Sequence, residues 1–248
     1  MPPKPGEGMP PEVLALTRRI TEPKEMLEKV LQGLGYPAQP ESFFEENFNA
    51  ALQAMMDEGL KLLQEEQSAA MDEIIQLYQR YRKLDVGRSD LVLWKGMQSL
   101  TNQKRKRAGV HMELCVRWIL RKCEIPFEEG REETGRSDLI CPSLETFRQH
   151  PELCIVLEFK RTIRERWKEV RDEISRSGHH VWLLTLDDFI SNEVVSLIAA
   201  GNITLYVPQV VFDRLNRNPS HLRSIRTFVV DLRNVIGRSP QTRLPSTD

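Results

Sequence analysis

The residues best suited to chemistry in this sequence lie within one stretch, residues 136–173. An apolar run from Cys154 to Lys160 ends in the tripeptide Glu158-Phe159-Lys160. Successive side chains of a strand point to opposite faces, so Glu158 and Lys160 share one face while Phe159 lies on the other. Two opposite charges at the end of a buried strand are costly unless they work together or reach solvent. The spacing therefore predicts either a catalytic pair or a plain Glu/Lys pair at a strand end.

A third charged residue, Asp138, opens another short apolar segment after the turn-like Gly135-Arg136-Ser137. If the two expected strands are neighbours, Asp138 and Glu158 converge as oxygen ligands of an ion such as Mg²⁺. Lys160 would then lie beside the ion, where an ammonium group orients a water or stabilises charge that develops on a phosphate. This arrangement would suit metal-dependent hydrolysis of a phosphate ester, although such tripeptides are common and a plain Glu/Lys pair is the more frequent case.

The triplet Arg164-Glu165-Arg166 follows closely. Arginine donates two hydrogen bonds to guanine, and glutamate accepts one from the amino group of cytosine. The triplet is therefore suited to reading adjacent G and C in a major groove. On a solvent-exposed face, however, the same residues would be a simple charge cluster.

These residues carry a resemblance to known proteins. Asp138 followed by Glu158-Phe159-Lys160 resembles the PD-(D/E)xK nuclease motif, although Ser137 stands where that motif has proline. With the triplet and the later acid Glu173, residues 100–210 resemble type II restriction endonucleases of the EcoRII and PspGI group, which is related to the CCGG-cutting enzymes. The resemblance implies Mg²⁺-dependent hydrolysis of double-stranded DNA by a homodimer at a short palindromic site containing CC/GG.

Site roles also follow from the resemblance. The triplet would read the CC/GG steps, and the metal-binding acid of the group lies on the following helix, where this sequence has Glu173. This chain keeps Glu158 as well, so either glutamate is a candidate for the second metal ligand, with Glu173 favoured. Two alternatives remain on the same fold: a less specific nuclease of the DNA-repair type, and an inactive DNA-binding protein.

A run of basic residues lies before a helix that we expect to begin near residue 110. Basic residues beside the start of a helix could bind a phosphate, or they could simply form a solvated tract. The resemblance implies that Glu113, on that helix, faces the metal site and holds a metal-bound water; a surface salt bridge is the alternative. The candidate DNA contacts here are Gln103, Lys104, Arg105, Lys106 and Arg107.

Aromatic residues are interspersed with basic residues between residues 78 and 95, a mixture that suits stacking on a nucleobase. Enzymes that this sequence resembles flip the central base pair of their site, which requires an aromatic shelf outside the duplex. Trp94 and Tyr81 are the candidates, and a role in the core is the alternative for each.

The rest of the chain predicts an α/β protein. We expect a flexible N-terminus at 1–11, a helical region at 12–100 that supports dimerisation or faces DNA, and a nuclease core at 101–248. Within the helical region, apolar residues recur at helical spacing at 12–34 and 42–84, which predicts helices there. Within that core, strands alternating with helices predict a mixed β-sheet flanked by helices. Strands are expected at 181–186 and 203–207, with a helix at 190–200 between them.

Composition agrees with a cytoplasmic protein. The chain has 248 residues, 40% of them hydrophobic, and a net charge of −1. We find neither a membrane-spanning apolar run nor a signal peptide and expect no membrane contact. The four cysteines show no CxxC spacing, so we expect them to be reduced core residues.

Overall fold

The computed structural model describes residues 8–130, 139–163, 180–199, 203–215 and 220–237. It divides the chain into two compact units, Met1–Pro37 with Ala54–Leu114, and Ala38–Gln53 with Cys115–Asp248. This division does not coincide with the boundary expected between residues 100 and 101. Two long helices cause the difference, because α3 (Glu41–Arg82) and α4 (Val86–Lys122) each contribute to both units.

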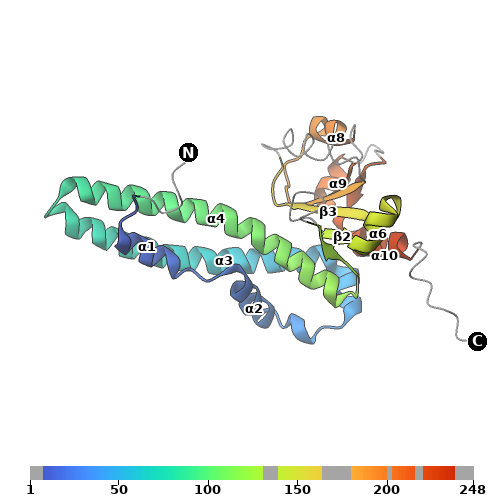
Figure 1. Cartoon of the computed structure of the whole chain (residues 1–248), viewed down its shortest axis with the longest axis horizontal. Coiled ribbons are helices and arrows are strands. Elements are labelled where there is room, and N and C mark those ends of the chain that lie inside the picture. Colours follow the sequence, from blue (N-terminus) through green and yellow to red (C-terminus); the bar gives the residue numbers. More distant parts are fainter. Residues whose placement is uncertain (1–7, 131–138, 164–179, 200–202, 216–219, 238–248) are drawn as a thin grey trace, which may run out of the picture. The chain divides into compact units, whose positions relative to one another are not determined.

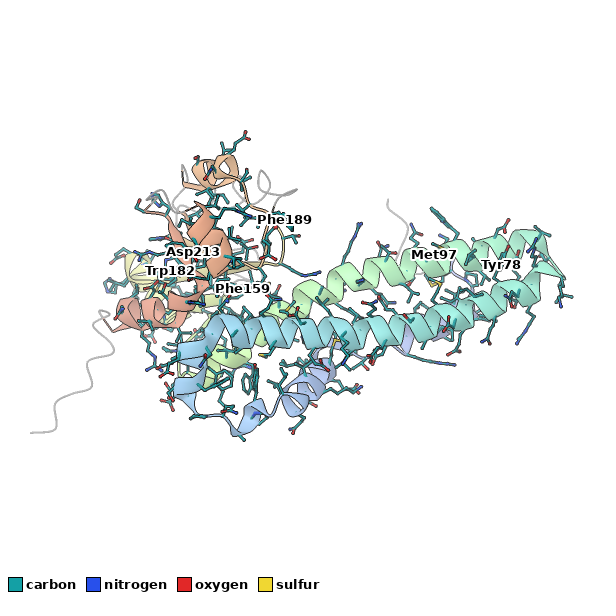
Figure 2. All side chains as sticks on the ribbon, turned by 180° about the vertical axis from the view of Figure 1, so that it is seen from behind. Tyr78, Met97, Phe159, Trp182, Phe189 and Asp213 are labelled. Carbon is teal, nitrogen blue, oxygen red and sulfur yellow. The ribbon has the colours of Figure 1, made fainter. Side chains whose placement is uncertain are left out.

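The first unit is helical. Its α1 (Pro11–Arg18) and α2 (Pro23–Gly33) both begin at proline, which fits the first helical position because it lacks an N–H that would go unbonded there. Gly35 follows α2 with φ +65°, a conformation that favours glycine. Within this unit α3 and α4 run side by side (Figures 1 and 2), and Gln67 donates a hydrogen bond to the carbonyl of Leu100. These helices confirm the apolar periodicities expected at 12–34 and 42–84.

The core of the first unit forms where α1 meets this pair of helices. Val13 and Leu16 of α1 are buried with Leu63 and Ile74 of α3 and Val92 of α4. Each helix buries a stripe of apolar residues spaced three or four apart, which is the pattern that burial of one helical face requires.

The second unit contains a six-stranded sheet of strand order β1-β2-β3-β4-β5-β6 among the described residues. The pairs β1–β2 and β2–β3 are antiparallel, and β3 to β6 are parallel. A mixed sheet flanked by helices is therefore confirmed. The strands are β1 (Glu128–Glu129), β2 (Leu139–Cys141), β3 (Ile155–Lys160), β4 (Val181–Thr185), β5 (Ile203–Val207) and β6 (Leu222–Ser224).

One face of the sheet packs on helices α6 (Leu144–Gln149), α8 (Asn192–Ala199) and α9 (Gln209–Leu215). The buried cluster on this face joins Leu183 and Leu205 of the sheet to Ile198 of α8 and Val211 of α9. The 3-10 turn η2 (Pro151–Leu153) leads from α6 into β3. Helices and strands alternate here as the sequence predicted, because parallel neighbours need a crossover connection.

The opposite face carries aromatic side chains. Trp182 and Tyr206 lie next to each other on β4 and β5, with ring centroids 5.0 Å apart. Phe228, which opens α10 (Phe228–Ile236) after the 3-10 turn η3 (Ile225–Thr227), packs edge-on against Tyr206 at 4.9 Å. Phe48 of α3 lies 5.2 Å from Phe228. The sheet is thus covered on both faces, and the edge formed by the carboxyl ends of β3 and β4 is where a site can form.

Candidate functional site at the carboxyl end of β3

The charged pair expected on β3 is present. Glu158 and Lys160 share a face of the strand, and Lys160 Nζ lies 2.8 Å from Glu158 Oε1. The Glu158 side chain is only 4% exposed, whereas that of Lys160 is 37% exposed. The glutamate side chain is therefore buried, whereas the lysine side chain is partly open to solvent in the part of the chain that the structure describes.

The neighbouring strand is also the one expected. Strands β2 and β3 pair directly, with Leu139 opposite Leu157. Leu139 follows Asp138 in the chain, and Leu157 precedes Glu158. Asp138 itself lies outside the described residues, so its convergence with Glu158 stays a prediction.

Two further predicted groups, Glu173 and the triplet Arg164-Glu165-Arg166, also lie outside the described residues. Within the part of the chain that the structure describes, no three His, Cys, Asp or Glu side chains are grouped so that they could hold a metal ion. The predicted metal ligands include Asp138 and Glu173, so this search does not test that set.

Two buried residues that the sequence did not single out lie at the end of β4. Thr185 stands in register with Lys160. Asp187, 2% exposed, accepts hydrogen bonds from the amides of Ile163 at 3.0 Å and Phe189 at 3.1 Å. A signal was present in the sequence: polar residues directly after a buried parallel strand fall at the sheet edge where sites of α/β proteins form.

The basic segment at residues 104–107 does not precede a helix, as the sequence had suggested, but lies inside α4. The helix begins at Val86, so the expectation of a helix start near residue 110 is wrong. A clamp built on helix N-terminal amides is therefore not possible here, because those amides are bonded within the helix. Lys104, Arg105 and Lys106 are exposed side chains on the surface of α4.

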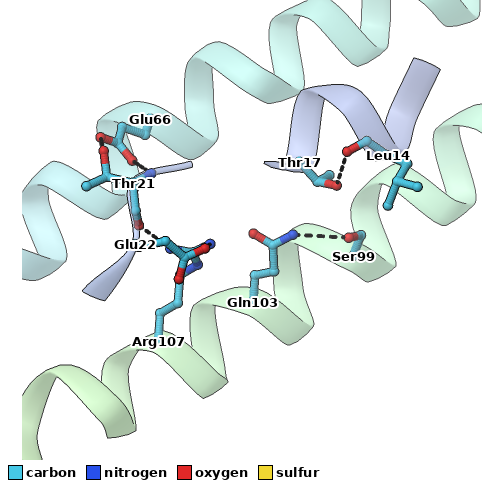
Figure 3. A network of polar contacts seen from close by, with 8 residues as sticks. All are labelled: Leu14, Thr17, Thr21, Glu22, Glu66, Ser99, Gln103 and Arg107. Atoms are coloured by element: carbon cyan, nitrogen blue, oxygen red, sulfur yellow. Dashed lines mark hydrogen bonds and ion pairs between the residues drawn. The ribbon is translucent and has the colours of Figure 1, made fainter. Parts of the chain in front are cut away.

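Gln103 and Arg107 belong to a polar network within the first unit (Figure 3). Gln103 donates to Ser99 Oγ at 3.4 Å. The guanidinium of Arg107 donates to the carbonyl of Thr21 and to Glu22, 3.2 Å away, and its side chain is 11% exposed. Arg107 thus holds the start of α2, a contact it would have to give up to reach a phosphate.

The two aromatic candidates differ in exposure. Tyr81 donates its hydroxyl to Glu12 at 2.7 Å, and the guanidinium of Arg88 lies 4.5 Å from its ring centroid. Trp94 on α4 is 65% exposed. The structure therefore leaves the face of Trp94 available to a base, while Tyr81 is engaged in the packing of α1.

Glu113 lies on α4 in the first unit and is half-buried. Its expected role beside the metal stays a prediction.

The four cysteines are free and buried, as expected. Burial raises the pKa of the Cys123 thiol to about 12 and that of Cys154 to about 11, and it raises the pKa of Cys115 and Cys141 further. Thiols with such pKa values are protonated at neutral pH and unreactive.

A mixed sheet with helices on both faces and a Glu-x-Lys at the end of a central strand defines the PD-(D/E)xK restriction-endonuclease fold. The comparison with protein families agrees with this class. The family described as EcoRII C terminal matches residues 70–234, and the chain belongs to that family.

Individual relatives agree with the family. The type II restriction enzyme SsoII of Shigella sonnei is 28% identical over 118 residues, which span 43% of this chain and 39% of that enzyme. Thus this chain matches about two fifths of the relative's length.

None of the described helices is both long and apolar enough to cross a membrane.

Solved structures share the fold. Metal-depleted Ecl18kI in complex with uncleaved, modified DNA superposes with a TM-score of 0.81 at 18% identity, over 97% of this chain and 88% of that one. A complex of the restriction endonuclease PspGI with substrate DNA gives a TM-score of 0.70 at 17% identity, over 90% of this chain and 96% of that one.

Proposed function

We propose that this protein is a type II restriction endonuclease, a site-specific deoxyribonuclease that hydrolyses phosphodiester bonds in double-stranded DNA. The observation that carries the proposal is the Glu158–Lys160 pair at the end of β3, in a chain of the EcoRII C-terminal family. A buried charged pair whose ammonium end reaches solvent suits work on a phosphate better than a role in the core. The proposed activity also implies a cytoplasmic location, in the compartment that holds the DNA substrate.

The proposed cofactor is Mg²⁺. Asp138 and Glu173 would hold it through carboxylate oxygens, the ligands that Mg²⁺ prefers. When bound, the ion neutralises charge on the scissile phosphate and acidifies water. Glu158 is the alternative second ligand, but its 2.8 Å contact with Lys160 supports a different role, because a carboxylate already paired with an ammonium gains less from a cation.

Lys160 would act directly on the reacting groups. Its partly exposed ammonium would donate hydrogen bonds to the attacking water or to a phosphate oxygen. Glu158 would hold that ammonium in place through their contact. In this proposal the buried Glu158 positions Lys160, and the partly exposed Lys160 contacts the reacting groups.

Recognition would rest on the triplet Arg164-Glu165-Arg166, with a short palindromic site that contains CC/GG. Lys104, Arg105 and Lys106 are exposed and would contact phosphates. Trp94 would stack on a flipped central base, and Glu113 would hold a metal-bound water. A palindromic site implies a homodimer that presents one active site to each strand.

Incubation of the protein with plasmid DNA and Mg²⁺ tests the proposal. Discrete fragments whose ends map to one CC/GG-containing sequence are the expected result. A smear would indicate a less specific nuclease, and retardation of DNA without cleavage would indicate a binding protein. Either of these two results would overturn the proposed function.

A further inference from the structure

The carboxyl ends of β3 and β4 are joined by buried side chains. Thr185, the last residue of β4, is 0% exposed. Its hydroxyl donates a hydrogen bond to the carbonyl of Arg161 at 3.3 Å and accepts one from the amide of Asp187 at 3.2 Å. One hydroxyl therefore ties the chain that leaves β3 to the chain that leaves β4.

The carboxylate of Asp187 makes a second tie. One oxygen accepts from the amide of Ile163 at 3.0 Å, and the other accepts from the amide of Phe189 at 3.1 Å. Burial of a carboxylate is costly unless it is hydrogen-bonded, and these backbone amides supply that compensation. The geometry thus holds the carboxylate at one position between the two chain segments.

The segment held in this way is short and lies in a specific place. It comprises residues 161–163, between Lys160 and the triplet that begins at Arg164. The side chain of Ile163 is 0% exposed and belongs to the buried cluster of the sheet. Both ends of the segment are therefore fixed, one by the strand and one by the core, while Thr185 and Asp187 fix its backbone between them.

We infer that Thr185 and Asp187 are positioning residues: they hold residues 161–163, the segment that joins Lys160 to the proposed recognition triplet in the sequence, and thereby couple cleavage to base recognition. This inference rests on the proposed function and adds two residues to it. Three residues separate the group that acts on the phosphate from the group that reads the bases. A rigid link of that length makes cleavage depend on correct base contacts, because a small displacement of either group removes the productive geometry.

A purely structural role for these residues makes a different prediction. Loss of stability lowers the amount of folded enzyme, so cleavage of every DNA would fall by the same factor. Loss of the coupling between Lys160 and base recognition instead lowers cleavage of the correct site more than cleavage of a site with one changed base pair. The ratio of the two rates separates the two roles.

The experiment compares Thr185→Val, which removes the hydroxyl at nearly constant shape, with Thr185→Ser, which keeps it. It also compares Asp187→Asn with the neighbouring exposed variant Asp188→Asn. Cleavage of the correct site and of a site with one changed base pair is measured over a range of DNA concentrations up to saturation, well below the melting temperature of each variant. Exchange of the backbone amides of residues 161–163 is followed on the same proteins without DNA.

For Thr185→Val and Asp187→Asn, kcat on the correct site should fall on the order of 100-fold, with a smaller change in KM. The ratio of correct-site to changed-site cleavage should fall with it, and amide exchange at Ile163 should accelerate. Thr185→Ser and Asp188→Asn should resemble the parent protein in all three measurements.

Equal losses on both DNAs, or unchanged amide exchange at Ile163, would overturn the inference. A parent protein that does not cleave DNA at all overturns the proposed function instead, and the exchange measurement still decides whether Asp187 and Thr185 hold the segment.

Discussion

Lys160 Nζ and Glu158 Oε1 are 2.8 Å apart on one face of β3, with the carboxylate buried and the ammonium reaching solvent. Side chains two residues apart on a strand point to the same face, so Glu158 and Lys160 are neighbours. Because the glutamate is buried, its charge is compensated by the ammonium of Lys160. A buried carboxylate orients its partner more strictly than an exposed one, since exposed pairs are screened and mobile. The position of the ammonium is therefore set by the sheet.

Lys160→Ala should lower Mg²⁺-dependent cleavage by about 100- to 1,000-fold, because it removes the charge that stabilises the developing phosphate anion. DNA binding without metal should change little. Plasmid cleavage and gel retardation measure the two effects. Arg161→Ala, which removes an exposed base one residue further on, is the matched control, and equal losses in both variants would assign the effect to general charge.

Substitution of each acid separates the two candidate metal ligands. Glu173→Gln should lower cleavage strongly and raise the Mg²⁺ concentration needed for half-maximal residual activity, because a neutral amide is a poorer ligand than a carboxylate. Glu158→Gln should keep metal binding but lower kcat, because Lys160 loses the carboxylate that holds its ammonium in place. Calorimetric titration with Mg²⁺ supplies a readout besides activity, and loss of binding in Glu158→Gln alone would make Glu158 the ligand.

Trp94→Ala should weaken binding to DNA that contains the site by about 1–3 kcal/mol, the usual contribution of a base stacked on an aromatic ring. A fluorescent base analogue at the centre of the site should also lose its flipped-base signal. Tyr81→Leu, which removes the ring as well as the hydroxyl, should leave both measurements unchanged and lower thermal stability, because Tyr81 bonds Glu12 and packs against Arg88. The reverse pattern would identify Tyr81 as the shelf.

Gly59 lies where a side chain has no room. A Cβ built there would be 2.1 Å from His111 Nε2. Gly59→Ala should lower the free energy of unfolding by about 1–3 kcal/mol through overpacking. Gly109→Ala on α4 has no atom within 4 Å of the new Cβ, and it should raise that free energy by about 0.5–1 kcal/mol. Urea denaturation measures both, and a stable Gly59→Ala protein would show that the histidine ring moves aside.

The pH dependence of stability should reflect His111. Burial lowers its pKa below the usual 6.5, against the effect of its hydrogen bond to the carbonyl of Met55. As pH falls through 6.5, the unfolded chain takes up a proton that the folded protein resists, so the free energy of unfolding should decrease. Burial and the nearby His221 lower the pKa of His180 as well, which adds to the same trend.

Denaturation at several pH values between 5 and 8 measures this trend. His111→Gln should flatten the decrease at acid pH, and the exposed-residue variant His150→Gln should retain it. An unchanged slope in His111→Gln would assign the dependence to other groups.

The sequence by itself determined the local structure and the class of the site. Apolar residues at helical spacing predicted the helices at residues 12–34 and 42–84, and alternation predicted Glu158 and Lys160 on one face of a strand. These features depend on which face of an element is buried, and that information lies in neighbouring residues.

The tertiary structure decided what depends on contacts between distant residues. Helix α4 extends back to Val86 because Val92 and Leu100 are buried in the core of the first unit, which overrides the polar composition of residues 102–107. Arg107 forms an ion pair with Glu22, and Asp187 accepts a hydrogen bond from the amide of Ile163. Neither contact can be predicted from the spacing of these residues in the sequence. A hydrogen bond between distant residues forms only after packing has brought their elements together, so a local pattern identifies the residue type but not its partner.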